Sequence, residues 1–289
     1  MSLLQERFTL TKAQKQAERL TTITMINTPN TPFIAPDWQS ILAFNHLDTF
    51  HALWQTAIDL VDNPNQQGKG CSVVGTKLLQ LPNGNQQLVY IKKQQHYMVR
   101  RWWNGWWRKL FACEAEFYAC NSYHAVNIAT LTPIYFEKSM EQGDSCAILI
   151  TLALDNYTDI NTWRDTTKPS IKKRYFIIRQ VAQLIKNLHD KGWMHYSLYP
   201  KHIFIRENEV CLIDLEKTRR FLWRWQAIKR DLSTLYRRAI DWSNKDAWCF
   251  LLAYCGGDKR TARGLWNKLV TINPLSPCER GKCKQSLRG

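Results

Sequence analysis

The 289-residue sequence has no apolar run long enough to cross a membrane. Its longest apolar runs, Cys146–Leu154 and Ala247–Cys255, reach about half of the ~20 residues that a transmembrane helix needs. The N-terminus lacks the apolar stretch of a secretory signal peptide, and no internal repeat is present. These absences argue against an integral membrane protein and predict a protein that is made and kept in the cytoplasm.

Acidic residues are scarce, with 24 Asp+Glu against 40 Lys+Arg, so the formal net charge is +16. This charge predicts an anionic partner, such as nucleic acid, acidic lipid headgroups or phosphates. Apolar residues make up 45% of the chain, which excludes a disordered protein because enough apolar surface is available to offset the ordering entropy.

The cysteines do not form the pattern of a metal site. Nine of them are scattered along the chain, most inside apolar segments, which is typical of buried free thiols in a reducing compartment. Cys278 and Cys283 are too far apart for the usual metal knuckle, and no second Cys or His pair lies near them. A zinc site is therefore disfavoured.

The pattern of apolar residues predicts an α+β protein with a strand-rich first half and a helical second half. We expect a helix over 38–61, strands over 68–95 around the loop Pro82–Asn85, a helix near 112–124 and a strand over 146–154. Helices over 170–189, 229–241 and 244–255 follow, with a small hairpin near Glu207. The predicted domains are an N-terminal helical lead-in (1–60), a strand-rich N-lobe (61–154), a helical C-lobe (155–271) and a disordered basic tail (272–289). This order is the layout of a bilobal kinase, although a generic α+β arrangement also fits it.

The strongest motif begins at Leu188, at the end of the long predicted helix, and runs through His195–Leu198 and Lys201–Ile205 to Leu212–Glu216. In kinases this order supplies the catalytic loop and then an Asp that binds metal, here Asp214.

The candidate parts for holding nucleotide phosphates precede this motif. The turn with Gly68, Gly70 and Ser72 would present backbone N–H groups to phosphates, and Lys92 ends a strand as the phosphate-pairing lysine does. Glu116 on the next helix would pair with Lys92, while Glu114 is the less favoured register. Asp214 would hold Mg²⁺.

Together these motifs resemble the InaA branch of the lipopolysaccharide core kinases, relatives of the Kdo and heptose kinases KdkA and WaaP. The resemblance spans roughly residues 48–256 and rests on four runs: Val61–Asn65 with Gly68–Ser72, Tyr90–Gln94, His195–Ile205 and Ile213–Leu215. It implies a eukaryotic-protein-kinase-like fold and ATP-dependent phosphorylation of an inner-core sugar, Kdo or heptose. The acceptor would be the lipid A–core glycolipid, reached by a peripheral protein at the cytoplasmic face of the inner membrane of a Gram-negative cell.

The resemblance also implies roles for further residues. His202 would share the metal with Asp214, Leu152 would join the cofactor-binding set, His195 would be structural, and Asp231 would brace the catalytic loop.

One position departs from the family pattern. Family kinases carry an Asp two residues after the loop His, where this chain has Ser197. Ser197 aligns a hydroxyl but is no carboxylate base, and losing a general base typically costs on the order of 10²–10⁴-fold in rate. The chain is therefore either a slow kinase, a kinase whose base lies elsewhere, such as Glu216, or a pseudokinase that serves as a membrane-associated binding or scaffold protein.

Two basic aromatic segments, 100–109 and 217–230, are candidates for contact with the membrane or acceptor. The second, which includes Arg219 and Arg230, follows Asp214 directly and is expected to meet phosphates on lipid A or the core sugar. The residues of this surface are Arg100, Arg101, Trp102, Trp103, Trp106, Trp107, Arg108, Lys109, Arg219 and Arg220. Trp and Arg side chains stack on single-stranded bases, but they also settle at lipid headgroups. The kinase motifs favour an anionic membrane surface, so nucleic acid is the less favoured partner; packing under the first lobe and a solvated helix face are the plainer alternatives.

Overall fold

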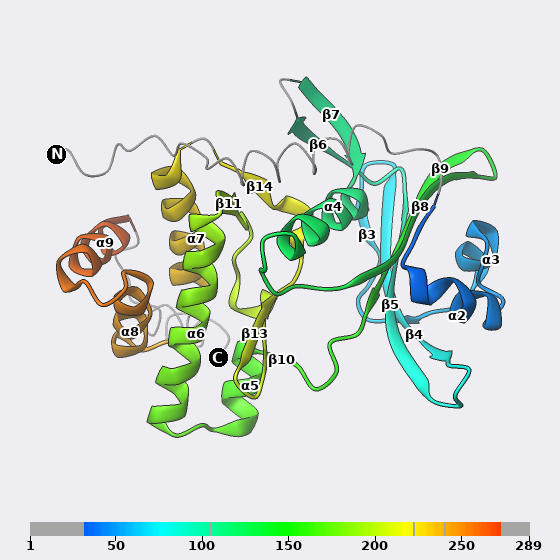
Figure 1. Cartoon of the computed structure of the whole chain (residues 1–289). Coiled ribbons are helices and arrows are strands. Elements are labelled where there is room, and N and C mark those ends of the chain that lie inside the picture. Colours follow the sequence, from blue (N-terminus) through cyan, green and yellow to red (C-terminus); the bar gives the residue numbers. More distant parts are fainter. Residues whose placement is uncertain (1–31, 104–105, 222, 240, 273–289) are drawn as a thin grey trace, which may run out of the picture. The chain divides into compact units, whose positions relative to one another are not determined.

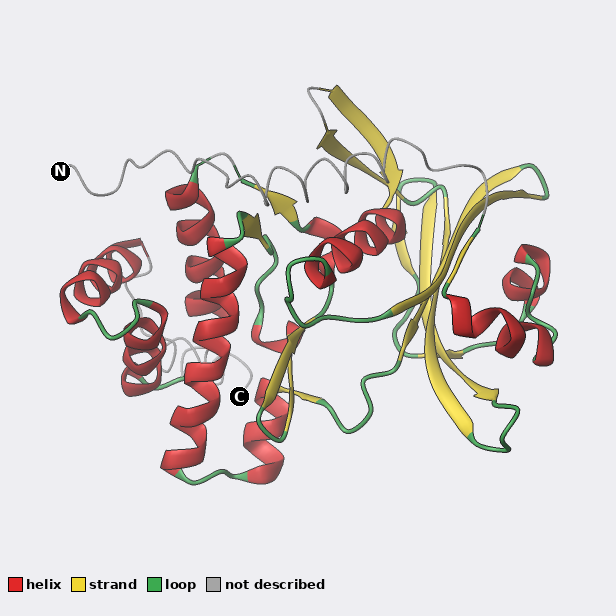
Figure 2. Cartoon of the chain, in the orientation of Figure 1, coloured by secondary structure: helices red, strands yellow, loops and turns green. Residues whose placement is uncertain are grey.

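The computed structural model describes residues 32–103, 106–221, 223–239 and 241–272, which fall into two compact units (Figure 1). The described part of the strand-rich unit comprises residues 32–125 and 131–155, and that of the helical unit comprises residues 126–130 and 156–272. Figure 2 shows the difference in content, with most of the long strands in the first unit and most of the helices in the second.

The strand-rich unit is built on an antiparallel sheet with strand order β1-β8-β9-β5-β4-β2, and β3 also pairs with β4. It contains the long hairpin of β4 and β5, whose turn includes Gly84 at a positive φ of 83°. The strand bounds are β1 (Phe33–Ile34), β2 (Asp59–Leu60), β3 (Asn65–Gln67), β4 (Gly70–Gln80), β5 (Gln86–Gln95), β8 (Pro133–Glu141) and β9 (Asp144–Leu152).

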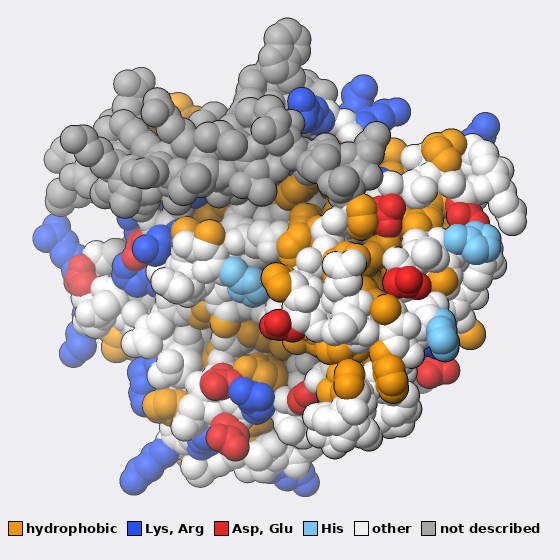
Figure 3. Space-filling model, turned by 45° about the vertical axis from the view of Figure 1, so that its right-hand side comes forward, with side chains coloured by type: hydrophobic (Ala, Val, Ile, Leu, Met, Phe, Trp, Pro, Cys, Tyr) orange, Lys and Arg blue, Asp and Glu red, His pale blue; other side chains and the backbone are white. Residues whose placement is uncertain are grey.

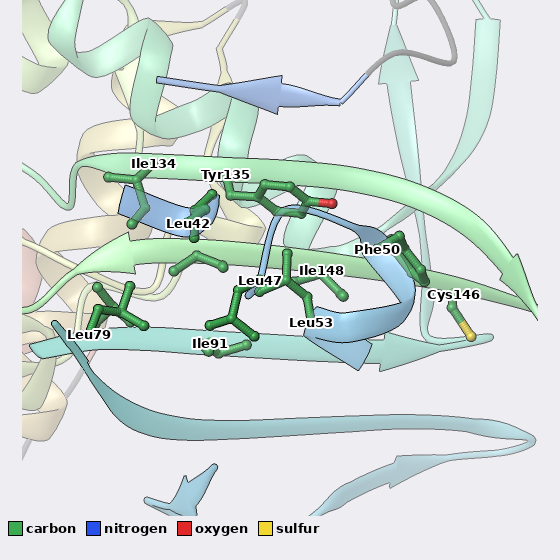
Figure 4. Packing of buried hydrophobic residues seen from close by; sticks show 12 residues of the cluster. Leu42, Leu47, Phe50, Leu53, Leu79, Ile91, Ile134, Tyr135, Cys146 and Ile148 are labelled. Atoms are coloured by element: carbon green, nitrogen blue, oxygen red, sulfur yellow. The ribbon is translucent and has the colours of Figure 1, made fainter. Parts of the chain in front are cut away.

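Each face of this sheet carries its own apolar cluster, because successive side chains of a strand point to opposite faces. One face packs against α2 (Gln39–Phe44) and α3 (Phe50–Gln55), and its cluster includes Ile91 of β5 and Ile148 of β9 (Figure 4). The other face packs against α4 (Ala112–His124), and its cluster includes Leu149 of β9 and Phe117 of α4. Alternate residues of β5 therefore serve two different environments.

The helix predicted over 38–61 is wrong, since the chain forms two short helices and strand β2 there. Asn45 ends α2, where its side chain donates to the Ile41 carbonyl and to the Gln80 carbonyl of β4. Thr49 then starts α3 by accepting the N–H of Ala52 (3.2 Å). The caps and the contact with β4 decide the break, which apolar spacing alone does not reveal.

Lys93 of β5 closes the end of α3. Its Nζ donates to the carbonyls of Trp54 (2.8 Å) and Thr56 (2.7 Å), the position where a helix leaves carbonyls without partners. Burial lowers the pKa of Lys93 to about 8, with Lys77 adding to the shift.

The helical unit is built around α6, a 20-residue helix that packs against α8. Ser170 caps its start, and its buried face includes Ile178, Val181 and Leu188. Gly192, at φ +83°, turns the chain away from its end. The helices of the unit are α5 (Ile160–Thr167), α6 (Ile171–Asp190), α7 (Arg224–Arg238), α8 (Asn244–Tyr254) and α9 (Lys259–Ile272).

Short strands on this unit hold the loop that follows α6. β11 (Trp193–Met194) pairs with β14 (Arg219–Arg220), and β10 (Thr158–Asp159) pairs with the hairpin of β12 (Ile203–Arg206) and β13 (Glu209–Leu212). The predicted hairpin near Glu207 is confirmed. It places residues 195–202 and the segment after β13 on the same unit.

The described cysteines are all free thiols, and four of the seven are buried: Cys113, Cys120, Cys146 and Cys211. Cys278 and Cys283 lie outside the described residues.

Candidate active site

In the strand-rich unit, Lys92 and Glu116 form an ion pair. Lys92 lies on the α4 side of β5, because its neighbours Ile91 and Lys93 point to the α2–α3 side. Its Nζ donates to Oε2 of Glu116, and the two side chains are 19% and 4% exposed. Glu114 instead binds Lys138 (Oε1–Nζ 2.6 Å) and accepts the N–H of Phe111. Glu116 is thus the partner of Lys92, and a mostly buried pair of this kind fixes the position of the ammonium.

A buried glutamine ties the helix that carries Glu116 to the strand that carries Lys92. Oε1 of Gln94 accepts the N–H of Cys113 (2.8 Å) at the start of α4, and its Nε2 donates to Oγ of Ser72 (3.0 Å) on β4. Gln94 is only 1% exposed. The sequence reading gave Gln94 no role; its place two residues after Lys92 on the same strand face is the signal that would have found it.

The predicted phosphate turn is the connection between β3 and β4. Gly68 has a positive φ of 59°, which suits a tight turn. Gly70 is required for a different reason: a Cβ there would lie 2.7 Å from the backbone oxygen of His96. Ser72 is buried and bound to Gln94, and the role of this turn toward a nucleotide stays a prediction.

Leu152, the remaining residue of the cofactor-binding prediction, ends β9 opposite Val89 of β5. It is partly buried and packs against the apolar cluster on the α2–α3 side of the sheet. Its contact with a nucleotide stays a prediction.

In the helical unit, Asp231 of α7 holds the loop that contains His195. Its carboxylate is completely buried and accepts the N–H groups of His195 (2.7 Å) and Tyr196 (2.8 Å). It also accepts from Nε2 of His189 (3.1 Å), whose Nδ1 faces the hydroxyl of Tyr254 (2.8 Å). Three donors on one carboxylate fix the loop backbone, since hydrogen bonds to a charged acceptor are about twice as strong as neutral ones.

His195 is part of this support. It is completely buried, and burial lowers the pKa of its imidazole. Its Nε2 donates to the carbonyl of Ile213 (3.0 Å), directly before Asp214. The ring therefore links the loop to the segment after β13.

Asp214, His202 and Ser197 lie together in the helical unit. Nε2 of His202 is 3.2 Å from Oδ2 of Asp214, and Nδ1 of His202 is 2.9 Å from the Ser197 carbonyl. Asp214 adopts a left-handed conformation (φ +60°), and about a third of its side chain is exposed. Ser197 is only 3% exposed.

The donor set of His202 and Asp214 fits a divalent cation. Because Nδ1 donates to a carbonyl, Nε2 of a neutral His202 carries a lone pair directed toward the Asp214 carboxylate. Burial lowers the pKa of His202, which favours that neutral form, although Asp214 acts in the opposite direction. Mg²⁺ is commonly held by one or two carboxylates and completed by substrate phosphates and water. Among the residues described, no group of three or more His, Cys, Asp or Glu is placed to hold a metal by itself.

Arg219 and Arg220 form β14, next to this loop. Arg220 lies over the ring of Trp193 (4.9 Å to the centroid) and donates to the Lys191 carbonyl (3.1 Å), so it supports the chain after α6. Arg219 lies 3.8 Å from the ring centroid of Tyr196. The sequence reading missed Tyr196, which separates His195 from Ser197.

The first basic aromatic segment forms a hairpin of β6 (Met98–Trp103) and β7 (Trp106–Phe111), a two-stranded sheet of its own that projects beside α4 in Figure 1. Its register pairs Trp103 with Trp106 and Trp102 with Trp107 toward the tip. Arg101 pairs with Arg108 and Arg100 with Lys109 toward the base. Arg100, Arg108 and Lys109 are exposed, whereas the four Trp side chains lie outside the described part. The hairpin thus carries four cations toward its base and four tryptophans toward its tip.

On the face shown in Figure 3, Lys and Arg side chains stand singly or in small groups among hydrophobic, neutral and acidic side chains. No helix in the described residues is long and apolar enough to cross a membrane.

Comparison with known proteins agrees with the kinase-like features described above. The model of the lipopolysaccharide kinase (Kdo/WaaP) family matches residues 51–254, more than two thirds of the chain. Among solved structures, WaaP in complex with acyl carrier protein is similar, with a TM-score of 0.55 and 16% identity over 84% of this chain and 99% of that one. No curated protein sequence matches the chain. The similarity to WaaP confirms the predicted kinase-like α+β fold.

Proposed function

Because this chain belongs to the lipopolysaccharide kinase (Kdo/WaaP) family, we propose that it transfers phosphate from ATP to a Kdo or heptose residue of the lipid A–core glycolipid. The family supports a kinase of the lipopolysaccharide core, and a kinase uses ATP. The observation that carries the proposal is the ion pair of Lys92 with Glu116, since a strand lysine oriented by a helix glutamate is the device with which kinases hold nucleotide phosphates.

The residues of the chain would divide the work as follows. Lys92 binds phosphate oxygens and Glu116 keeps its ammonium in place. Asp214 and His202 hold Mg²⁺, and Asp231 fixes the loop on which Ser197 stands. When bound, ATP and Mg²⁺ supply the phosphoryl group and neutralise its charge; positioning and electrostatics then account for most of the rate.

The β6–β7 hairpin supports action at the cytoplasmic face of the inner membrane. Its basal cations suit acidic headgroups, at about 1 kcal/mol for each Lys or Arg near the surface. The residues toward its tip include four tryptophans, Trp102, Trp103, Trp106 and Trp107. Tryptophan is enriched at the headgroup level of membranes. A peripheral enzyme would reach a membrane-held glycolipid in this way.

A second candidate function is that of a pseudokinase, which binds nucleotide or membrane and scaffolds a partner without turnover. Ser197 favours it, because this position holds no carboxylate to accept the proton of an acceptor hydroxyl. The two functions share Lys92, Glu116 and the hairpin, and they differ in whether phosphate is transferred.

The experiment that tests the proposal follows the thermal unfolding of the protein while ATP is titrated with and without Mg²⁺. Rough lipopolysaccharide is then added and its phosphate content is measured by mass spectrometry. A kinase is stabilised by Mg²⁺–ATP and adds phosphate, and Lys92→Ala removes both effects. Stabilisation without added phosphate supports the pseudokinase; absence of both effects from the wild type contradicts the kinase and any pseudokinase that binds nucleotide. Ser197→Asp separates slow from absent turnover, since a large gain in rate shows that the rest of the site is intact.

A further inference from the structure

The aromatic ring of Tyr196 holds two guanidinium groups beside the loop that carries Ser197. Arg219 Cζ lies 3.8 Å and Arg230 Cζ 4.2 Å from the centroid of the ring, so the two Cζ atoms are no more than about 8 Å apart. Arg219 comes from β14 and Arg230 from α7. Two separate elements therefore bring positive charge to one side chain.

Tyr196 is itself fixed in place. Its φ is +70°, a left-handed conformation that tyrosine seldom adopts, and its N–H is held by Oδ1 of Asp231 (2.8 Å). Asp231 directly follows Arg230 on α7, so neighbouring residues of one helix bind the backbone and the ring of the same tyrosine. The position of the two guanidiniums is thus set by the fold and not by mobile side chains alone.

Within the described part of the chain, neither guanidinium forms an ion pair with a carboxylate. Other arginines there do pair with an Asp or Glu, namely Arg164, Arg174, Arg206 and Arg224. Nε of Arg219 is buried and has no hydrogen-bond partner among the described residues. Buried donors in native proteins are normally satisfied, so an acceptor bound at this atom would be stabilising. A guanidinium stacked on a ring keeps the N–H groups at its edge available, and its planar fork matches carboxylate and phosphate oxygens.

We propose that Arg219 and Arg230 bind an oxyanion of the acceptor, a sugar carboxylate or a phosphate monoester, and so select an acidic sugar over a neutral one. This inference rests on the proposed function for its substrate. Tyr196 precedes Ser197 in the chain, with about 3.8 Å between adjacent Cα atoms, so an oxyanion held here places a sugar hydroxyl near the loop. Arg220 is excluded from this role, because it already stacks on Trp193 and donates to the Lys191 carbonyl.

The test measures binding of three probes to the full chain by NMR titration: free Kdo, a neutral heptose and the phosphate of that heptose. Arg230→Gln is the decisive variant, because Arg230 is exposed on α7 and its replacement leaves the core intact. Arg237→Gln is the matched control, since it removes the same charge from the same helix, and among the described residues Arg237 binds the Ser233 carbonyl. Arg219→Gln and Arg230→Lys complete the series, and thermal unfolding checks that each variant is folded.

We expect Arg230→Gln to weaken an anionic probe at least tenfold and to leave the neutral heptose unchanged, with no effect of Arg237→Gln. Arg230→Lys restores only part of the affinity, because it returns the charge without the planar fork. Loss confined to Kdo identifies a carboxylate, and loss confined to the heptose phosphate identifies a phosphate. An equal effect on the neutral and acidic probes, or no effect on any probe, overturns the inference.

The failure of this inference and the failure of the proposed function are distinguishable. If the wild type transfers no phosphate but Arg230→Gln abolishes binding of an acidic sugar, the anion site stands and the kinase assignment falls. If transfer to an acidic acceptor proceeds with an unchanged KM in the Arg219→Gln, Arg230→Gln double variant, the kinase assignment stands and the anion site falls.

Discussion

Replacing Asp231 by Asn tests whether one buried carboxylate holds the catalytic loop. Asn keeps a single acceptor oxygen and turns the other into an NH₂ donor, which then faces either the N–H of Tyr196 or the donors from His195 and His189. In the orientation that faces Tyr196, one charge-assisted hydrogen bond is lost, at about 1.5–3 kcal/mol, and one buried backbone donor stays unsatisfied, at about 1–3 kcal/mol. Because such contributions are not additive, we expect the free energy of unfolding to fall by about 3 kcal/mol.

Urea unfolding followed by tryptophan fluorescence and circular dichroism measures this change. For a protein of this size the melting temperature would fall by about 2–4 °C per kcal/mol. Hydrogen exchange of the His195 and Tyr196 amides should accelerate, since both lose protection directly. Asp241→Asn is the control: its carboxylate is 44% exposed and lies 3.4 Å from Arg164, so the change should stay under about 1 kcal/mol. A loss for Asp231→Asn no larger than that of the control would refute the role of Asp231 as the loop's anchor.

Three further predictions concern the strand-rich unit. Gly70→Ala should destabilise it by about 1–3 kcal/mol in urea unfolding, because the new Cβ meets the His96 backbone. Gly264→Ala on α9 is the control, since that glycine has no positive φ and its new Cβ meets no atom; a Gly70→Ala loss no larger than the control's would contradict this. Between pH 8 and 10.5 Lys93 is protonated in the unfolded chain but deprotonated in the folded one, so the free energy of unfolding rises with pH by up to about 3 kcal/mol. Lys93→Met should lose this rise. If the variant keeps the same slope of unfolding free energy against pH, the pKa of Lys93 is not lowered in the folded chain. Replacing the four basal cations of the β6–β7 hairpin by Gln should weaken binding to vesicles of anionic lipid on the order of 10²-fold or more, measured by co-sedimentation, while binding that is insensitive to these changes would remove the hairpin from the membrane contact. These cations are Arg100, Arg101, Arg108 and Lys109.

The side-chain directions of Lys92, Lys93 and Glu116 could be predicted from the sequence, because the periodicity of a strand or helix determines which face each residue lies on. Alternation along β5 puts Lys92 and Lys93 on opposite faces, and the helical repeat of α4 then selects Glu116 as the partner of Lys92. The hairpin near Glu207 and the end of α6 at Gly192 follow from equally local signals. In each case the periodicity of one element or the residues of one turn decide the outcome.

Contacts between residues far apart in sequence could not be predicted in this way. The break between α2 and α3 depends partly on Asn45 reaching Gln80, 35 positions later. The cation pair on Tyr196 depends on Arg219 and Arg230 arriving from β14 and α7, and the sequence shows only two more basic residues in a basic stretch. The β6–β7 hairpin was not predicted as two strands, because its charged residues and tryptophans were interpreted only as a surface that binds a partner.

The central claim is that this chain transfers phosphate, and single-turnover transfer from labelled ATP to lipid A–core tests it most directly. Excess enzyme with Mg²⁺ and rough lipopolysaccharide should place the label on a core sugar in the wild type. Asp214→Asn should abolish the transfer, because it removes the carboxylate that faces His202. Wild-type protein that binds Mg²⁺–ATP and labels no acceptor, or labelling that survives Asp214→Asn unchanged, would contradict the account.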